Sequence, residues 1–384
     1  MDQADTTRKE ELAALTAMVR EFAADNIAPI VADLDETERF PAEVYAQLGE
    51  LGLLGITVPE EDGGVGGCVA DYVTVMEELA YGYASVADQC GLVELVSSLL
   101  VKHGTSEQKA RYLPGLLAGT QRCSYALTEA DAGSDLGGLK TNAHRDGSDW
   151  ILNGEKIFIH NAPIADFAMV LALTDPEKRT HGGMTMFLVP VDTPGVERAY
   201  HEHKMGQRAS QVGGFVFTDV RLPADAVLGA EGAGFAAVMS VLEKGRLGIG
   251  ALANGISHAA LDTATEHAKT RRQFKKPIGA FQTIAFTLAD MATDYRAARL
   301  LLDAGAELLD TGQDAGTACS MAKLFASEAA IRNTGKAVQI LGGSGYIRGV
   351  VAERLYRDAR ITTIYEGTSE VQRLIISRSL LGRL

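Results

Sequence analysis

The stretch Trp150-Ile-Leu-Asn-Gly-Glu-Lys-Ile-Phe-Ile-His160 carries the strongest indication of fold in this chain. It places two runs of β-favouring residues on either side of an Asn-Gly pair, which is a frequent turn between antiparallel strands. We therefore predict a β-hairpin that turns at Asn153 and Gly154. Short apolar runs at 167–173, 184–191 and 215–222 are further expected strands, so the middle third of the chain is predicted to be mostly β.

Helical patterns lie on both sides of this β region. Residues 10–28 carry apolar side chains three to five positions apart, which is typical of an amphipathic helix. Between Phe281 and Leu302 the apolar interval alternates between three and four, as in a long helix of a bundle. Similar helices are expected at 235–268 and 318–341. We therefore predict an α+β protein of three domains: an N-terminal α-helical domain (1–121), a middle β domain (122–233) and a C-terminal α-helical bundle (234–384).

The composition excludes several classes of function. With 36 Lys and Arg against 50 Asp and Glu, the chain of 384 residues has a net charge of −14, which disfavours binding to nucleic acid or to an anionic membrane. No uninterrupted apolar run reaches the roughly 18 residues of a membrane span. The N-terminal residues lack the pattern of a secretory or organellar leader. We predict a soluble, cytoplasmic protein without nucleic-acid binding or membrane insertion.

The cysteines and histidines do not indicate a metal site. Cys68, Cys90, Cys123 and Cys319 are far apart in the sequence, and four cysteines do not make a disulfide framework in a chain of this length. His201 and His203 form the only close histidine pair, without a nearby cysteine or carboxylate cluster. We predict that the protein binds no metal.

A glycine-rich stretch at 341–346, LGGSGY, does not match the G-x-G-x-x-G spacing of dinucleotide-binding folds. It also follows an expected helix, whereas that fingerprint requires a preceding strand. A Rossmann-type or phosphate-loop enzyme is therefore excluded.

Near the C-terminus, residues 361–372 read ITTIYEGTSEVQ. Ser369 and Gln372 have the spacing of a capping box, so a last helix is expected to begin there. Glu366 would lie on the turn just before it, placed to project into a cleft. The alternative is an acidic residue favoured by the helix dipole.

Five short motifs follow one another along the chain: YALTEADAGSD (125–135), GEKIFIHN (154–161), RRQF (271–274) followed by FQ (281–282), QILGG (339–343) and YEGT (365–368). In this order they resemble the motifs of the acyl-CoA dehydrogenase family, and the resemblance extends over essentially the whole chain. The resemblance implies an FAD-dependent enzyme that removes an α-proton and a β-hydride from an acyl thioester, which leaves a trans-2-enoyl thioester.

The resemblance also implies roles for individual residues. Glu366 matches the catalytic base, and the backbone of Gly367 lies beside it on the substrate side. Glu243, Arg246 and Ser134 match positions that hold the thioester-bearing arm. The flavin contacts implied are Tyr125, Leu127, Thr128, Ser134, Phe158, Ile159, His160, Arg271, Gln273, Phe281, Gln282, Gln339, Gly342, Gly343, Thr368 and Glu370. Because several of these would come from a neighbouring subunit, a homotetramer built as a dimer of dimers is expected, with electron-transfer flavoprotein as the electron acceptor.

Three residues depart from the family pattern. Ala130 stands where proline is usual, which removes a rigid turn but no chemistry. His160 stands where a hydroxyl commonly meets the flavin N5, and an imidazole there could tune the flavin. Glu94 lies on a helix expected to line the end of the acyl cavity, so it would bind a polar acyl group; alternatively it faces solvent or pairs with a Lys or Arg.

The sequence leaves three alternatives to an acyl-CoA dehydrogenase. The substrate could be a polar acyl group on a carrier protein instead of CoA. The enzyme could be a flavin oxidase or monooxygenase on the same fold. The chain could also be a non-catalytic scaffold, although the presence of Glu366 and of the flavin-contact set disfavours this.

Overall fold

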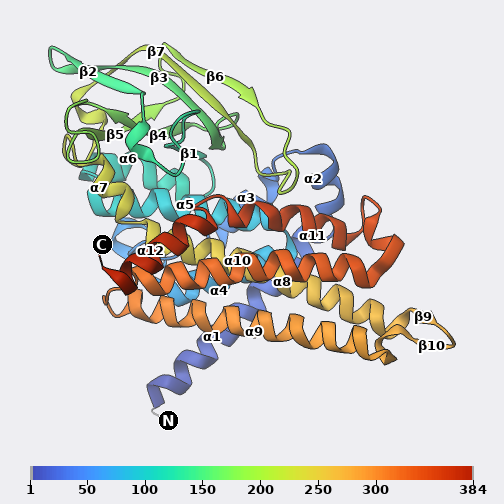
Figure 1. Cartoon of the computed structure of the whole chain (residues 1–384). Helices are drawn as coiled ribbons and strands as arrows, with labels where there is room; N and C mark the ends of the chain where they lie inside the picture. The colour runs from blue at the N-terminus through green and yellow to red at the C-terminus, as the bar shows by residue number, and fades with distance from the viewer. Residues whose placement is uncertain (1–2, 383–384) are drawn as a thin grey trace.

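The computed structural model describes residues 3–382, which form a helical layer, a β-sheet and a helical bundle in chain order (Figure 1). This confirms the predicted α+β architecture. The N-terminal helices are α1 (Gln3–Phe22), α2 (Val31–Thr37), α3 (Ala42–Glu50), α4 (Val69–Gly82), α5 (Ala84–His103) and α6 (Ser106–Leu117). The strands of the middle region are β1 (Cys123–Ala126), β2 (Asn142–Asp146), β3 (Asp149–His160), β4 (Phe167–Leu173), β5 (Met184–Pro190), β6 (Val196–His201), β7 (Val212–Leu222) and β8 (Val227–Leu228). The C-terminal elements are α7 (Gly234–Met239), α8 (Leu242–Thr270), β9 (Arg272–Gln273), β10 (Lys276–Pro277), α9 (Gln282–Asp310), α10 (Gly316–Leu341), α11 (Val351–Ala359) and α12 (Ser369–Leu381).

The sheet of the middle region has the strand order β6-β7-β3-β2-β4-β5-β8 within the described residues, and β1 pairs in parallel with β4. Most of its neighbouring strands are antiparallel, without the β-α-β alternation of a nucleotide-binding fold. The apolar face of β4 and β5 packs against the helices, which fixes the sheet on the bundle. The end of β3 is thereby held over the helical layer.

The predicted turn at Asn153 and Gly154 is wrong. Both residues lie within the single long strand β3, and the chain turns instead at Gly147, where φ is 64°. Gly154 has a φ of 143° and lies at a register shift between β3 and β7. The glycine therefore permits an irregularity in the strand pairing, where it does not form a turn. Pairing of β3 with both β2 and β7 outweighs the local turn preference of Asn-Gly.

Two helical regions, one N-terminal and one in the bundle, differ clearly from the expected ranges. The first expected helix begins at Gln3, and at Ala23 it changes into a π-helical turn that ends at Ile27. The stretch 235–268 is two helices, because the chain breaks between α7 and α8 at Ser240 and Val241. This break places Glu243, Lys244, Gly245 and Arg246 in the first turns of α8, beside the C-terminal turn that carries Glu366.

Helix α5 is the one helix among residues 3–382 with the length and apolar composition of a membrane span. However, 89% of its apolar window is buried inside the protein. Such burial is that of a core helix, and α5 packs against α4, α6 and α8.

Candidate active site

Glu366 lies on a tight turn between α11 and α12, in a conformation that its neighbours impose. Its φ is 51°, a left-handed value that is uncommon for a residue other than glycine. Gln372, which is fully buried, donates from Nε2 to the carbonyl of Gly367 at 2.9 Å and to that of Glu366 at 3.3 Å. The predicted capping box is shifted, because Thr368 caps α12 by accepting a hydrogen bond from the backbone N–H of Val371, and Gln372 holds the turn instead.

Glu366 is half-buried, and its carboxylate points into the protein. Its Oε2 is buried and unpaired among the described residues. The carboxylate packs on Gly245 of α8. A Cβ added to Gly245 would lie only 3.1 Å from Oε2 of Glu366 and 3.1 Å from Cδ2 of Leu95. Burial raises the pKa of Glu366, and the nearby cations Lys323 and Arg246 oppose that rise. An unpaired buried carboxylate with a raised pKa is suited to accept a proton from a ligand.

Two buried cations flank this carboxylate. Lys323 on α10 is fully buried and donates from Nζ to the carbonyl of Gly367 at 2.7 Å, and burial lowers its pKa to about 8. Arg246 is 6% exposed and has no hydrogen bond or ion pair within residues 3–382. Since a buried guanidinium without a partner is costly, Arg246 is available for a polar group of a ligand.

We expect Lys323→Met to move the pH dependence of proton abstraction to higher pH. The cation lowers the pKa of Glu366, so its removal raises that pKa, and the deprotonated base then appears only at higher pH. The pH profile of kcat, measured at saturating substrate, tests this. Lys336→Met on the same helix is the matched control, and a profile of Lys323→Met that coincides with that of the control would contradict the prediction.

Two segments of the middle region meet beside this site. The hydroxyl of Ser124 donates to the carbonyl of His160 at 2.8 Å, and the backbone N–H of Ile157 donates to the carbonyl of Thr128 at 3.0 Å. These bonds bring the segment 125–128 next to the segment 158–160, as the resemblance implies. Ile159 is buried in the β core between them.

The surface formed by segments 125–128 and 158–160 has features that suit the binding of a planar ligand. Phe158 is 62% exposed although it is a large aromatic residue, and its φ is 55°. The hydroxyl of Tyr125 is buried without a hydrogen-bond partner within the described residues. Leu127 and Thr128 are half-buried, and Ser134 is exposed on the following loop. An exposed ring and an unpaired hydroxyl beside a buried base fit an isoalloxazine and its polar edge.

His160 belongs to a buried polar network that the sequence did not reveal. Its Nε2 lies 2.9 Å from Oγ of Ser210 and 2.8 Å from Nε2 of Gln89, and Ser210 donates to Asp88 at 2.7 Å. Burial lowers the pKa of His160, while the charge of Asp88 opposes this and that of Lys204 adds to it. Nδ1 of His160 has no partner within residues 3–382, so it is the nitrogen left for a ligand.

Glu94 pairs with a lysine of the protein. Its side chain is fully buried, and Oε1 accepts hydrogen bonds from Nζ of Lys244 at 2.8 Å and from the hydroxyl of Thr57. Lys244 also donates to the hydroxyl of Ser98 at 2.6 Å. The alternative that Glu94 faces solvent is wrong, and the alternative that it pairs with a neighbouring cation is confirmed. Because this charge is already matched, the site does not require a cationic substrate.

Most of the remaining predicted flavin residues lie at the far end of the bundle or on its surface, whereas Thr368 caps α12 two residues from Glu366. Figure 1 shows the β9–β10 hairpin at the end of the bundle opposite α12 and away from the sheet. The hairpin is therefore distant from the turn at Glu366, which precedes α12, so one chain does not gather all predicted residues in one place. The exposed positions are Arg271, Gln273, Gln282, Gln339, Gly342, Gly343 and Glu370, while Phe281 and Thr368 are half-buried. Glu243, which was predicted to hold the thioester-bearing arm, is half-buried in the first turn of α8.

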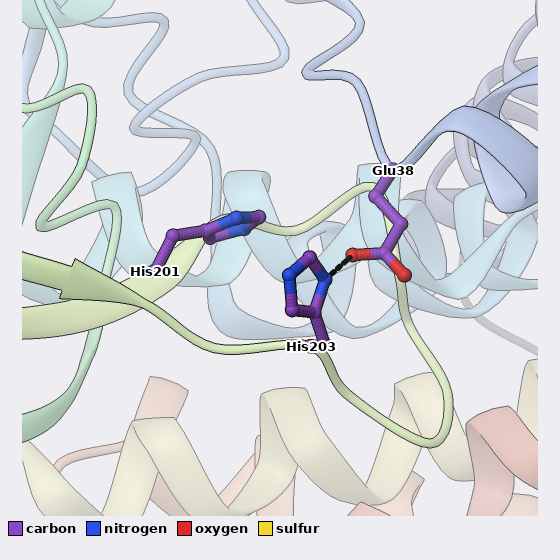
Figure 2. Close-up of side chains that lie close together, drawn as sticks. All are labelled: Glu38, His201 and His203. Atoms are coloured by element: carbon purple, nitrogen blue, oxygen red, sulfur yellow. Dashed lines mark hydrogen bonds and ion pairs between the residues drawn. The ribbon is translucent and has the colours of Figure 1, made fainter.

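Tertiary structure brings Glu38 to the two histidines that are close in sequence, and Figure 2 shows the three side chains together. Their ligand atoms lie within 4.8 Å of one another. Nδ1 of His203 lies 2.9 Å from Oε2 of Glu38, and Nη2 of Arg208 lies 2.7 Å from its Oε1. Both carboxylate oxygens of Glu38 thus have partners. A metal ion would have to displace these partners, and the guanidinium of Arg208 would repel it. We do not infer a metal site here.

The order of helices, sheet and helices agrees with the comparison with known sequences, which identifies a family of oxidoreductases. The acyl-CoA dehydrogenase N-terminal, middle and C-terminal domains match residues 9–120, 124–220 and 232–381. The chain therefore belongs to the acyl-CoA dehydrogenase family.

Individual relatives cover nearly the whole chain. The mitochondrial short-chain specific acyl-CoA dehydrogenase of Bos taurus is 43% identical over 367 residues, which are 94% of this chain and 88% of the relative. The caffeyl-CoA reductase-Etf complex subunit CarC of Acetobacterium woodii is 41% identical over 369 residues, or 95% and 97% of the two chains. The solved structure of butyryl-CoA dehydrogenase from Megasphaera elsdenii has a TM-score of 0.93 and 39% identity, and the match covers 96% of this chain and 98% of that one.

Proposed function

We propose that this protein is an FAD-dependent dehydrogenase of acyl-CoA thioesters and that Glu366 removes the α-proton. The observation that carries the proposal is Oε2 of Glu366, which is buried and unpaired within residues 3–382, together with the raised pKa of this carboxyl group. Membership of the acyl-CoA dehydrogenase family supports the reaction class. An acyl-CoA is favoured over a carrier-bound acyl group because the relatives named above are acyl-CoA enzymes.

The residues of this chain account for the proton step. A thioester α-proton is too weakly acidic for an ordinary carboxylate in water, so both a desolvated base and hydrogen bonds to the thioester oxygen are needed. Burial desolvates the carboxyl group of Glu366 and so raises its pKa. The strained turn presents the backbone N–H of Glu366 as a candidate donor to the thioester oxygen. Arg246, with its free guanidinium, and the neighbouring Glu243 would hold the polar arm of the substrate.

FAD, when bound, supplies the acceptor for the β-hydride. The exposed ring of Phe158, the unpaired hydroxyl of Tyr125 and the free Nδ1 of His160 fit the isoalloxazine end. Arg271 and Gln273 would reach the diphosphate of a neighbouring subunit, because arginine makes bidentate contacts with phosphate.

The surface of the bundle supports assembly into a homotetramer. Only five of the 29 residues of α9 are buried within the chain. Phe274 and Tyr346 are 87% and 86% exposed, and such large apolar residues favour a protein interface. We propose that the partner's hairpin completes the flavin site. The relative that belongs to an Etf complex supports electron-transfer flavoprotein as the acceptor.

Anaerobic titration of the purified flavoprotein with a panel of acyl-CoAs tests the function. We expect the visible flavin band to bleach, with release of the corresponding 2-enoyl-CoA. A yellow protein that no acyl-CoA bleaches would overturn the proposal and direct attention to carrier-bound substrates. Rapid oxygen consumption during turnover would favour the oxidase alternative.

A second prediction concerns His160. We expect His160→Thr to have a lower flavin reduction potential than the wild type, with the difference growing as pH falls below 6.5. Burial lowers the pKa of His160 from 6.5, so the imidazole is neutral at pH 7 and gains its charge only in acid. A positive charge stabilises the reduced, electron-richer cofactor and so raises its potential. Spectroelectrochemistry between pH 5 and 8 measures this, with His181→Thr as a control in an exposed loop. Coincident potentials across the range would refute a tuning role.

A further inference from the structure

Tyr72 of α4 fills the space between α5 and α8 close to the candidate base. The side chain is 1% exposed. A Cβ placed on Gly248 of α8 would lie 2.0 Å from its Oη, and one placed on Gly91 of α5 would lie 3.6 Å from it. The hydroxyl therefore reaches the backbone of α8 through a gap that the missing side chain of Gly248 leaves.

The hydroxyl of Tyr72 lies one helical turn from the carboxylate of Glu366 along α8. Glu366 packs on Gly245, and Tyr72 packs on Gly248. Residues three apart share a face of a helix. They are separated by about 4.5 Å along the axis, which is about the length of a four-carbon acyl group. Burial raises the pKa of Tyr72, and the charges of Glu94 and Glu366 add to the rise, as expected for a phenol between two carboxylates.

Tyr72 has apolar neighbours and, within residues 3–382, a hydroxyl without a hydrogen-bond partner. Its hydroxyl makes no hydrogen bond within the described residues, although a buried phenol usually has a partner. Leu95 contributes apolar surface beside Gly245, and Met76 does so beside Gly91, where a Cβ would lie 3.1 Å from its Cε. The ion pair of Glu94 and Lys244 joins α5 and α8 next to these residues. A longer alkyl chain would have to displace the phenol and approach a buried charge pair, which is unfavourable.

We propose that Tyr72 sets the depth of the acyl cavity and restricts the substrate to short acyl chains of about four carbons. This inference rests on the proposed acyl-CoA dehydrogenase function. The side chain acts by volume: the ring and hydroxyl occupy the position that the fifth and later carbons of a longer chain would take.

The test compares the chain-length preference of the wild type, Tyr72→Ala and Tyr72→Leu, all as FAD-loaded protein. The measurement is kcat/KM with butyryl-, hexanoyl- and octanoyl-CoA. Dissociation constants of the same ligands, measured in variants that also carry Glu366→Gln, separate binding from turnover. Tyr81→Ala is the matched control, because Tyr81 lies on the same helix and its hydroxyl bonds to Asp262 instead.

We expect the wild type and Tyr81→Ala to prefer butyryl-CoA, and we expect both Tyr72 variants to favour the longer ligands. The ratio of kcat/KM for octanoyl-CoA to kcat/KM for butyryl-CoA should rise by about tenfold for each pair of methylene groups that the enlarged cavity accepts. If Tyr72→Ala does not fold, Tyr72→Leu decides, because it keeps most of the apolar volume.

Three results would overturn the inference in distinguishable ways. A wild type that prefers octanoyl-CoA would show that Tyr72 does not limit the cavity. Variants that keep the wild-type ratio, in both kcat/KM and dissociation constants, would show that another group does. A flavoprotein that no acyl-CoA reduces would instead overturn the proposed function, and this inference with it.

Discussion

Glu366→Gln is expected to lower turnover by about 10²–10⁴-fold, the usual contribution of a general base. Glutamine keeps the size of the side chain but cannot accept the α-proton. The turn at Glu366 is held by Gln372 and Lys323 through backbone carbonyls, so the substitution leaves its geometry in place. The purified variant should therefore keep its yellow colour and its flavin content.

Flavin bleaching under stopped flow, with the best acyl-CoA of the panel, measures this effect on the chemical step. Glu266→Gln, an exposed position on α8, is the control and should bleach at the wild-type rate. Substantial dehydrogenation by Glu366→Gln would refute the assignment of the base. Loss of flavin from the variant would instead assign Glu366 a structural role.

Glu94→Ala is expected to destabilise the protein by about 3–5 kcal/mol, because it leaves a mostly buried Lys244 without its counter-charge. The double variant Glu94→Ala/Lys244→Met should recover most of this loss, since neither charge is then left alone. The unfolding free energy from urea titration of each variant measures the effect. Glu328→Ala, which breaks a partly exposed pair with Arg373, should cost less than about 1 kcal/mol.

The same Glu94 variants also test the polar-substrate alternative. If the carboxylate binds only Lys244, Thr57 and the surrounding helix, then the preference among polar and apolar acyl groups stays unchanged in the double variant. A loss of preference for amino-bearing acyl groups would revive that alternative. A destabilisation by Glu94→Ala as small as that of Glu328→Ala would contradict the buried-pair account.

The sequence by itself determined the order of helices, sheet and helices and singled out Glu366. Both follow from local patterns: the spacing of apolar residues reflects the period of each element, and Tyr365 to Thr368 form a short motif next to a helix start. The strand at 167–173 was predicted with its observed bounds for the same reason. The roles of the motif residues, by contrast, came from resemblance.

Only the tertiary structure decided which groups meet. Nothing local indicates that Lys244 would neutralise Glu94, that Ser210 and Asp88 would engage His160, or that Tyr72 would lie one turn from the base. Each of these contacts joins elements distant in the chain, and packing of whole helices and strands sets them. Non-local packing also explains the wrong prediction of a turn at the Asn-Gly pair in β3. The local turn preference of this pair is outweighed by hydrogen bonding of β3 to two neighbouring strands.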